Sequence, residues 1–168
     1  MRAKTYKNGH MYLYFTYDTE IGDLMLVSDG KSIVTVHYGA GALRPDVGIE
    51  EEDPILMDAY SEINQYFFGQ RREFTIPCEP MGSEEEIKIL NHLKSNVPYG
   101  KFISYEALAE DLGIDIEAVR KAVDTCTCPI FYPTHRVINA DKTPGGYVAE
   151  VNKQVRLLKM EVMNVRNR

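Results

Sequence analysis

A chain of 168 residues is long enough for one ordinary domain, or for a small domain with a second unit packed on it. Hydrophobic residues make up 44% of it, which allows a buried core and argues against a disordered chain. The net charge of −6 argues against a general nucleic-acid coat protein. Residues 1–82 hold 7 Lys and Arg against 13 Asp and Glu, whereas residues 83–168 hold 12 of each. A local basic face on the second half therefore remains compatible with the composition.

The first 80 residues predict a small antiparallel sheet with one helix. Strand-favouring residues dominate 11–17, 24–27 and 33–38, and residues 28–31 supply a hairpin turn between the last two. After a polar stretch at 44–54, apolar residues recur at helical spacing from Ile55 to Phe68, and Gly69 is the expected stop. Residues 77–82 have the composition of a boundary.

Residues 83–168 predict helices. Ser83 and Glu86 have the spacing of a capping box, before a stripe formed by Ile87, Leu90 and Leu93. Two short helices follow, capped by Ser104 and Asp115 and separated by Gly113, which is helix-turn-helix spacing. Their expected inward residues are Leu108, Ala109, Leu112, Ile116, Val119, Ala122 and Val123. A last helix is expected over 152–163, with one face formed by Val155, Leu158 and Val162.

Three cysteines, an odd number, argue against a disulfide framework and favour a reducing compartment. Cys126 and Cys128 form a C-x-C pair, which is a poor zinc signal because a closed site needs four nitrogen or sulfur ligands. No secretory signal is apparent, and no apolar run approaches the roughly 20 residues of a membrane span. We therefore expect a cytoplasmic protein with no metal, no cofactor and no membrane association.

The most distinctive segment is Pro-Thr-His-Arg-Val at 133–137, preceded by Ile-Phe-Tyr at 130–132 and followed by Gly-Gly-Tyr at 145–147. Further pieces are Val-Pro-Tyr-Gly at 97–100, Ser-Tyr at 104–105 with Leu-Ala at 108–109, and Leu-Leu at 157–158 with Glu161. In this order and spacing, these pieces resemble the O-6-alkylguanine DNA alkyltransferases over roughly residues 74–161. The first half is similar to that family in plan only, with strands and then a helix ending in Tyr-Phe-x-Gly.

The resemblance implies an α+β fold of two parts. Residues 1–80 would form an N-terminal subdomain of ribonuclease-H-like strands plus a helix. Residues 81–168 would form a helical, winged-helix-like domain that binds DNA through its helix-turn-helix and carries the alkylguanine pocket.

The resemblance also implies roles for individual residues. The family's nucleophilic cysteine falls on Thr134, the histidine that activates it through a water falls on His135, and the glutamate that orients the histidine falls on Glu161. The family's nucleotide-rotating tyrosine falls on Tyr105, which we expect to be exposed because it follows an N-cap serine. The residue that the family inserts into the base stack falls on Lys121 or Arg120. Further DNA contacts are implied for Ser104 and Arg136, and pocket walls for Pro129, Pro133, Gly145, Gly146 and Tyr147.

Three departures from the family pattern bear on function. Thr134 carries a hydroxyl, which ionises far less readily than a cysteine thiol with its pKa of about 8.5. The segment before it is about four residues shorter than in the family, and Cys126 stands where a hinge asparagine is usual. Asp124 replaces a glycine and adds a negative charge near the expected DNA face.

The sequence therefore predicts a monomer that binds alkylated guanine in duplex DNA by nucleotide flipping, without alkyl transfer. It is similar in this to the alkyltransferase-like proteins, which mark lesions for other repair proteins. One alternative is an active transferase that uses Thr134, Cys126 or Cys128. Another is a helix-turn-helix transcription regulator with a vestigial pocket.

Overall fold

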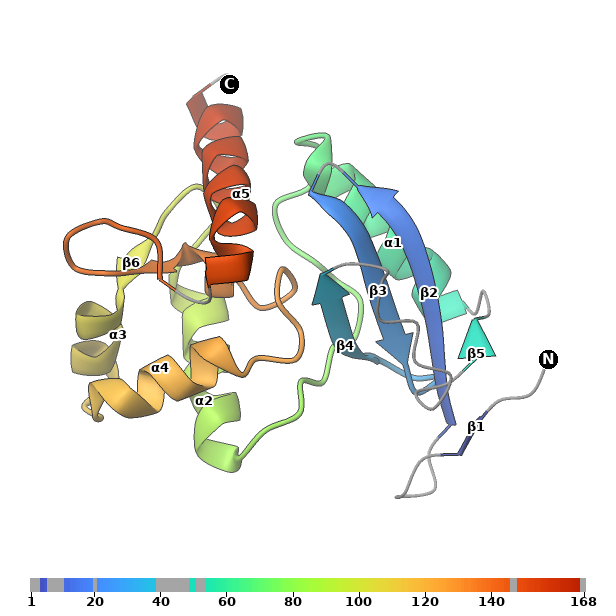
Figure 1. Cartoon of the computed structure of the whole chain (residues 1–168), viewed down its shortest axis with the longest axis horizontal. Coiled ribbons are helices and arrows are strands. Elements are labelled where there is room, and N and C mark those ends of the chain that lie inside the picture. Colours follow the sequence, from blue (N-terminus) through green and yellow to red (C-terminus); the bar gives the residue numbers. More distant parts are fainter. Residues whose placement is uncertain are drawn as a thin grey trace. The chain divides into compact units, whose positions relative to one another are not determined.

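The computed structural model describes residues 4–5, 11–19, 21–38, 49–50, 54–145 and 148–166. The chain divides into two compact units, Met1–Pro80 and Met81–Arg168. The described residues combine a small antiparallel sheet with helices, as Figure 1 shows. None of the described helices is long and apolar enough to cross a membrane.

The described sheet of the first unit contains five strands, four of them in the order β1-β2-β3-β4 with each antiparallel to its neighbour. They are β1 (Lys4–Thr5), β2 (Met11–Thr19), β3 (Gly22–Ser28) and β4 (Ile33–Tyr38), and β5 (Ile49–Glu50) pairs with β2 in parallel. The three strands predicted from the sequence are confirmed. The predicted turn between β3 and β4 is also present, because the Asp29 carboxylate accepts the backbone N–H groups of Lys31 and Ser32 at 2.9 Å each. Gly30 provides the positive φ of 91° that this turn needs.

The core of the first unit lies between the sheet and α1 (Pro54–Phe67), which crosses one face of the strands in Figure 1. Consecutive residues of β3 from Leu24 onward are buried, so both faces of this strand are covered. Helix α1 contributes the buried side chains of Leu56, Ala59, Ile63, Tyr66 and Phe67. It also buries Glu62, whose carboxylate accepts the backbone N–H groups of Thr75 at 2.8 Å and Ile76 at 3.3 Å. A polar residue can sit in this core because its carboxylate anchors the chain that leaves the unit.

The second unit is built from α2 (Glu84–Asn96), α3 (Tyr105–Leu112), α4 (Ile116–Asp124) and α5 (Val148–Arg166). The predicted N-caps are confirmed: Ser83 Oγ accepts the N–H of Glu86 at 3.1 Å, and Ser104 Oγ accepts the N–H of Ala107 at 3.0 Å. Gly113 ends α3 with a left-handed φ of 65°, also as predicted. A short parallel pair, β6 (Ile103–Ser104) with β7 (Val137–Ile138), was not predicted, because two-residue strands leave no periodic signal.

The main apolar core of this unit lies where α2, α3 and α4 pack together. Its buried members are Leu93, Val97, Tyr105, Leu108, Ala109, Val119, Val123 and Val137. On α2, the predicted inward residues Leu90 and Leu93 are buried. The third predicted residue, Ile87, is only half-buried, and Ile89 is buried in its place. Glu86 does not close the predicted capping box; it contacts Lys121 and Thr125 of the α4 region instead.

The inward face of α5 was also predicted wrongly. Val155, Leu158 and Val162 are only half-buried, and the inward positions are Gln154, Leu157 and Glu161. These three positions are three and four residues apart, so they share one helical face. Apolar spacing missed this face because two of its three members are polar and make buried hydrogen bonds.

Candidate functional site

A buried carboxylate lies at the centre of the candidate site. The Glu161 side chain has no exposed surface and accepts hydrogen bonds from His135 Nε2 at 2.6 Å and from Arg136 Nε at 2.9 Å. It also accepts from Arg136 Nη2 at 3.0 Å and from the backbone N–H of Gly100 at 3.1 Å. One side chain of α5 therefore joins the loop after α2 to the 3-10 turn η1 (Thr134–Arg136).

Gly100 explains why the Val-Pro-Tyr-Gly motif contributes to this site. Its φ is 82°, and a Cβ added there would lie 2.5 Å from Val165 Cγ2 of α5. Only glycine allows the backbone to approach α5 closely enough for its N–H to reach the Glu161 carboxylate. The preceding Tyr99 is fastened to the same helix, because its hydroxyl accepts a hydrogen bond from Asn164 Nδ2 at 2.8 Å.

Gln154 holds the other side of η1. Its Nε2 donates to the backbone oxygens of His135 at 3.2 Å and Val137 at 2.9 Å. Gln154 was not among the predicted site residues. A signal existed, since it lies seven residues, or two helical turns, before Glu161, but a single glutamine on a helix is not distinctive.

The charges around Glu161 determine its protonation state. Burial alone would raise the pKa of this carboxyl, but the hydrogen bonds and charges of His135 and Arg136 outweigh burial and lower the pKa to about 2. An ionised carboxylate can only accept hydrogen bonds, so His135 Nε2 must donate its proton to Glu161. In the neutral imidazole, the buried Nδ1 is then the basic nitrogen.

Thr134, at the predicted nucleophile position, begins the 3-10 turn and is half-buried. Its backbone N–H donates to the carbonyl of Tyr132 at 2.7 Å, which fixes the start of the turn. The predicted pocket residue Pro133 is buried directly before it. The residue directly before His135 in the chain therefore carries a secondary hydroxyl.

Two cysteines, Cys126 and Cys128, precede Thr134 in the chain, and the environment of Cys126 opposes thiolate formation. Burial raises the pKa of the Cys126 thiol to about 12, although a backbone hydrogen bond from Cys128 lowers it in part. Cys128 has no exposed surface. Among the described residues, no group of three or more His, Cys, Asp or Glu side chains is arranged to hold a metal ion.

The segment before Thr134, which was predicted to be shorter than in the family, forms a tight turn. The N–H of Tyr132 donates to the carbonyl of Cys128 at 3.0 Å. The predicted pocket residue Pro129 forms an isolated β-bridge with Tyr132. Ile130, between them, is buried with a φ of 77°, a conformation that branched residues rarely adopt. Such a residue costs on the order of 1–3 kcal/mol and persists only where its surroundings hold it.

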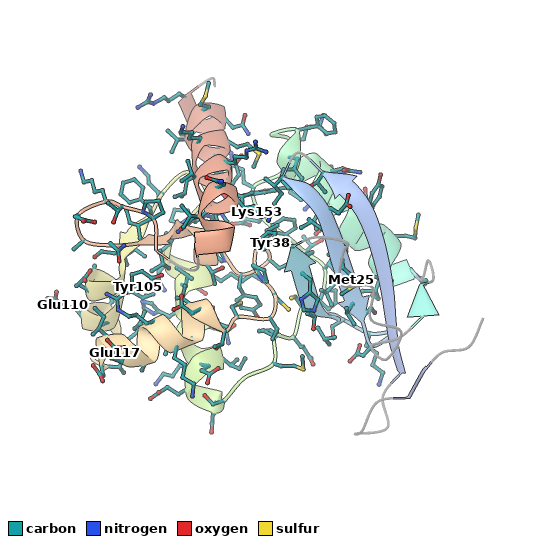
Figure 2. The ribbon with its side chains drawn as sticks, viewed as in Figure 1. Met25, Tyr38, Tyr105, Glu110, Glu117 and Lys153 are labelled. Atoms are coloured by element: carbon teal, nitrogen blue, oxygen red, sulfur yellow. The ribbon has the colours of Figure 1, made fainter. Side chains whose placement is uncertain are left out.

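Tyr105 does not have the exposure that its position after an N-cap predicted. Only 1% of it is exposed, because its ring packs in the α2–α3–α4 core and the Arg120 guanidinium lies 4.6 Å above its centre. Figure 2 labels Tyr105 among the side chains of this helical unit. Gly145 is packed against the hydroxyl end of the ring, and a Cβ there would lie within 2.8 Å of Tyr105 Cζ. Tyr105 is thus a core side chain with Arg120 on one face and Gly145 at its edge.

Arg136 was predicted to contact DNA, and the structure corrects this. Its side chain is buried, its Nε and Nη2 donate to Glu161, and its Nη1 donates to the carbonyl of Val97 at 2.8 Å. Its guanidinium also lies 5.8 Å from the centre of the Tyr99 ring. All of these contacts are internal, so Arg136 supports the fold rather than facing a phosphate.

The remaining predicted residues lie in three places. Arg120 and Lys121 are on α4, and the Ser104 hydroxyl caps α3. Gly145 follows a turn in which Asn139 Nδ2 donates to Thr143 Oγ1 at 3.0 Å and to the Pro144 carbonyl at 3.2 Å. Gly146 and Tyr147 lie outside the described residues.

Two family models and several curated relatives match the two units of this chain. The family model described as "6-O-methylguanine DNA methyltransferase, DNA binding domain" matches residues 85–163, and its "ribonuclease-like domain" matches residues 12–80. A methylated-DNA–protein-cysteine methyltransferase of Methanosarcina acetivorans is 29% identical over 153 residues, which are 88% of this chain and 97% of the relative. A DNA base-flipping protein of Thermus thermophilus is 32% identical over 116 residues, which are 68% of this chain and 78% of the relative.

Solved structures give the same result. The Mycobacterium tuberculosis O6-methylguanine methyltransferase has a TM-score of 0.81 at 28% identity, covering 92% of this chain and 94% of that chain. Mycobacterium tuberculosis OGT in complex with DNA has a TM-score of 0.80 at 27% identity, covering 90% and 94%. The matched segments include both units and the whole Glu161 network. The chain therefore belongs to the O6-alkylguanine DNA alkyltransferase family.

Proposed function

We propose that this protein binds duplex DNA and holds an O-6-alkylated guanine, rotated out of the base stack, without taking over the alkyl group. The observation that carries this proposal is the hydroxyl of Thr134, placed directly before an imidazole that a buried carboxylate orients. The relative named as a base-flipping protein supports recognition of a rotated base, and the relatives named as methyltransferases support an alkylated guanine as the target.

The chemistry at Thr134 argues against transfer. An imidazole oriented by a carboxylate can draw a proton from a neighbouring hydroxyl, as in serine hydrolases. There, however, the hydroxyl attacks a carbonyl, and an oxyanion hole stabilises the negative charge that develops. Displacement at a saturated alkyl carbon has no carbonyl and no such charge to stabilise. A hydroxyl oxygen is also less polarisable than sulfur, so Thr134 is a poor replacement for a thiolate.

The two cysteines do not restore the lost nucleophile. A thiol reacts as its thiolate, and a pKa of about 12 keeps Cys126 protonated at neutral pH. Cys128 is fully buried, which denies it contact with a substrate. These environments favour recognition without transfer over the alternative of a cysteine-based transferase.

Retention of the His135–Glu161 pair fits a protein that has lost the chemistry. Glu161 also holds Arg136 and the Gly100 backbone, so its carboxylate is needed for the fold whether or not transfer occurs. Removing one partner of a buried ion pair typically costs about 3–5 kcal/mol. An intact pair therefore supports the site's shape without being evidence for alkyl transfer.

The binding step would use the helix-turn-helix formed by α3 and α4 in a winged-helix-like domain. Arg120 and Lys121, both on α4, supply positive charge for phosphates, and by resemblance Lys121 or Arg120 would be the side chain inserted into the base stack. Flipping a nucleotide costs about a few kcal/mol of unstacking, and a damaged, poorly paired guanine costs least. This difference would be one source of selectivity for the lesion.

The experiment compares a duplex carrying O6-methylguanine with the same duplex undamaged. We expect tighter binding to the methylated duplex and no change in intact-protein mass after prolonged incubation. The matched variant Thr134→Cys should gain a methyl group, because it restores the nucleophile before the oriented imidazole. Any methyl gain by the unaltered protein would contradict the proposal, and its persistence or loss after Cys126→Ser and Cys128→Ser would show whether a cysteine had reacted. Binding that follows base sequence and ignores the lesion would favour a transcription regulator instead.

A further inference from the structure

Both cations of α4 are held by carboxylates of the protein itself. Lys121 Nζ lies 3.6 Å from Glu86 Oε1, a residue in the first turn of α2. Arg120 Nη2 lies 3.9 Å from Glu106 Oε1 on α3, and its Nε lies 3.9 Å from Glu117 Oε1 on α4. The residues expected to meet phosphate are therefore already engaged with negative charge in the free protein.

Glu86 is largely covered by the protein, whereas its partner Lys121 is exposed. The Glu86 side chain is 16% exposed and that of Lys121 is 70% exposed. The second carboxylate oxygen of Glu86, Oε2, lies 3.4 Å from the Thr125 hydroxyl, which donates to the Lys121 carbonyl at 2.6 Å, and a Cβ on the neighbouring Gly82 would approach Oε2 to 3.0 Å. The carboxylate is therefore largely shielded from solvent, while the lysine that pairs with it is open to solvent and to phosphate.

Arg120 is held in a second way. Its guanidinium lies over the Tyr105 ring at 4.6 Å, with the carboxylates of Glu106 and Glu117 beside it. Tyr105 is buried and packed against Gly145, so the surface under the guanidinium is rigid. Tyr105 and Glu117 are both labelled in Figure 2, as is Glu110.

We propose that Glu86 and Glu106 set the affinity of this protein for undamaged DNA by holding Lys121 and Arg120 in ion pairs. A phosphate must displace a carboxylate before it can gain either cation, and the displaced carboxylate then repels the DNA backbone. Binding to undamaged duplex depends almost entirely on phosphate contacts, so the cost of breaking these ion pairs weakens it directly. Binding to a lesion also gains contacts with the flipped base. The inference rests on the proposed DNA binding.

The consequence is a weaker attachment to the large excess of undamaged sites. Each cation that is freed should release about one more counterion on binding, which steepens the dependence of affinity on salt by about 0.9 per phosphate contact. Each exposed pair is weak and screened by salt, so the effect per carboxylate is moderate and largest at low ionic strength.

The test measures binding to an undamaged duplex across a salt series. Glu86→Gln should raise the affinity at low salt by roughly three- to tenfold and steepen the salt slope, since it removes the pairing charge and its repulsion of phosphate. The matched control is Glu85→Gln, which removes the same charge one position away. Glu85 lines a surface hollow with Glu84, Lys88, Ile89, Leu112 and Ile114 instead. On α3, Glu106→Gln should act in the same direction with a smaller effect, because Glu117 still pairs with Arg120. The exposed Glu110 gives the control Glu110→Gln.

A double-mutant cycle links the effect to the pair rather than to net charge. In a Lys121→Met background, Glu86→Gln should raise affinity no more than Glu85→Gln does. Thermal melting of each variant confirms that the folded protein is being compared. Equal affinities and slopes for Glu86→Gln and Glu85→Gln would overturn this inference while leaving the proposed function intact. Failure of every protein, unaltered chain included, to bind either duplex would overturn both.

Discussion

The second unit contains two sets of ion pairs that are chemically alike and physically different. Around Glu161, a carboxylate meets His135 and Arg136 with all three side chains buried and separations of 2.6–3.0 Å. Along α4, carboxylates meet Arg120 and Lys121 at 3.6–3.9 Å with most of these side chains partly or largely exposed.

The difference shows that burial, not residue type, decides what an ion pair does. A buried carboxylate cannot exchange its partners for water, so removing it leaves an uncompensated charge in the interior. An exposed pair exchanges with water, salt or phosphate at little cost. The first set therefore supports the shape of the site, and the second is available to respond to a ligand.

The largest expected effect is on the buried set. We expect Glu161→Gln to lower the free energy of unfolding by about 3–5 kcal/mol, because it leaves the buried Arg136 guanidinium without its counter-charge. Urea denaturation measures this loss. Glu110→Gln, an exposed carboxylate on α3, should change stability by less than about 0.5 kcal/mol. A loss below about 1 kcal/mol for Glu161→Gln would mean that the two sets do not differ as we infer.

Acid should affect the same carboxylate next most strongly. The folded pKa of Glu161 is lowered from its ordinary 4.5 to about 2, so its ionised form favours the folded state. This contribution, on the order of 3 kcal/mol, should be complete above about pH 4.5 and disappear as the pH falls towards 2. The difference in unfolding free energy between the unaltered protein and Glu161→Gln should therefore shrink across that window. A difference that is constant from pH 6 to about 2 would be incompatible with the lowered pKa.

Gly145→Ala tests the support beneath the exposed set. The added methyl group would overlap the hydroxyl end of the buried Tyr105 ring, so we expect a loss of about 1–3 kcal/mol in unfolding free energy. Removing the hydroxyl with Tyr105→Phe should recover part of this loss in the double variant. Thermal melting of the three variants provides the measurement. An unchanged melting temperature for Gly145→Ala would show that Tyr105 is not held against this glycine.

The smallest stability effect is expected for the exposed pairs themselves. Glu86→Gln and Glu106→Gln should each change the free energy of unfolding by less than about 1 kcal/mol. Thermal and chemical denaturation of both variants would check this. If either costs more than about 2 kcal/mol, that carboxylate belongs with the structural set and the contrast between the two regions is lost.

The sequence was sufficient for most of the local structure. Strands β2, β3 and β4, the turn at Asp29–Gly30, the caps at Ser83 and Ser104 and the stop at Gly113 all followed from propensity, alternation and capping chemistry. The ordered motifs around residues 97–100 and 133–137 were also sufficient to indicate the family. These features depend on neighbours within a few residues, which a sequence displays directly.

Only the tertiary structure decided which polar groups are buried and with what partner. Apolar spacing placed Val155, Leu158 and Val162 inward on α5, but the packed face carries Gln154 and Glu161, because the turn at 134–136 needs their hydrogen bonds. Arg136 looked like a DNA contact and is buried, and Glu86 looked like half of a capping box and pairs with Lys121. These partners are 17 to 39 residues apart in sequence. Local pattern cannot reveal such pairings, since they exist only once the helices have packed.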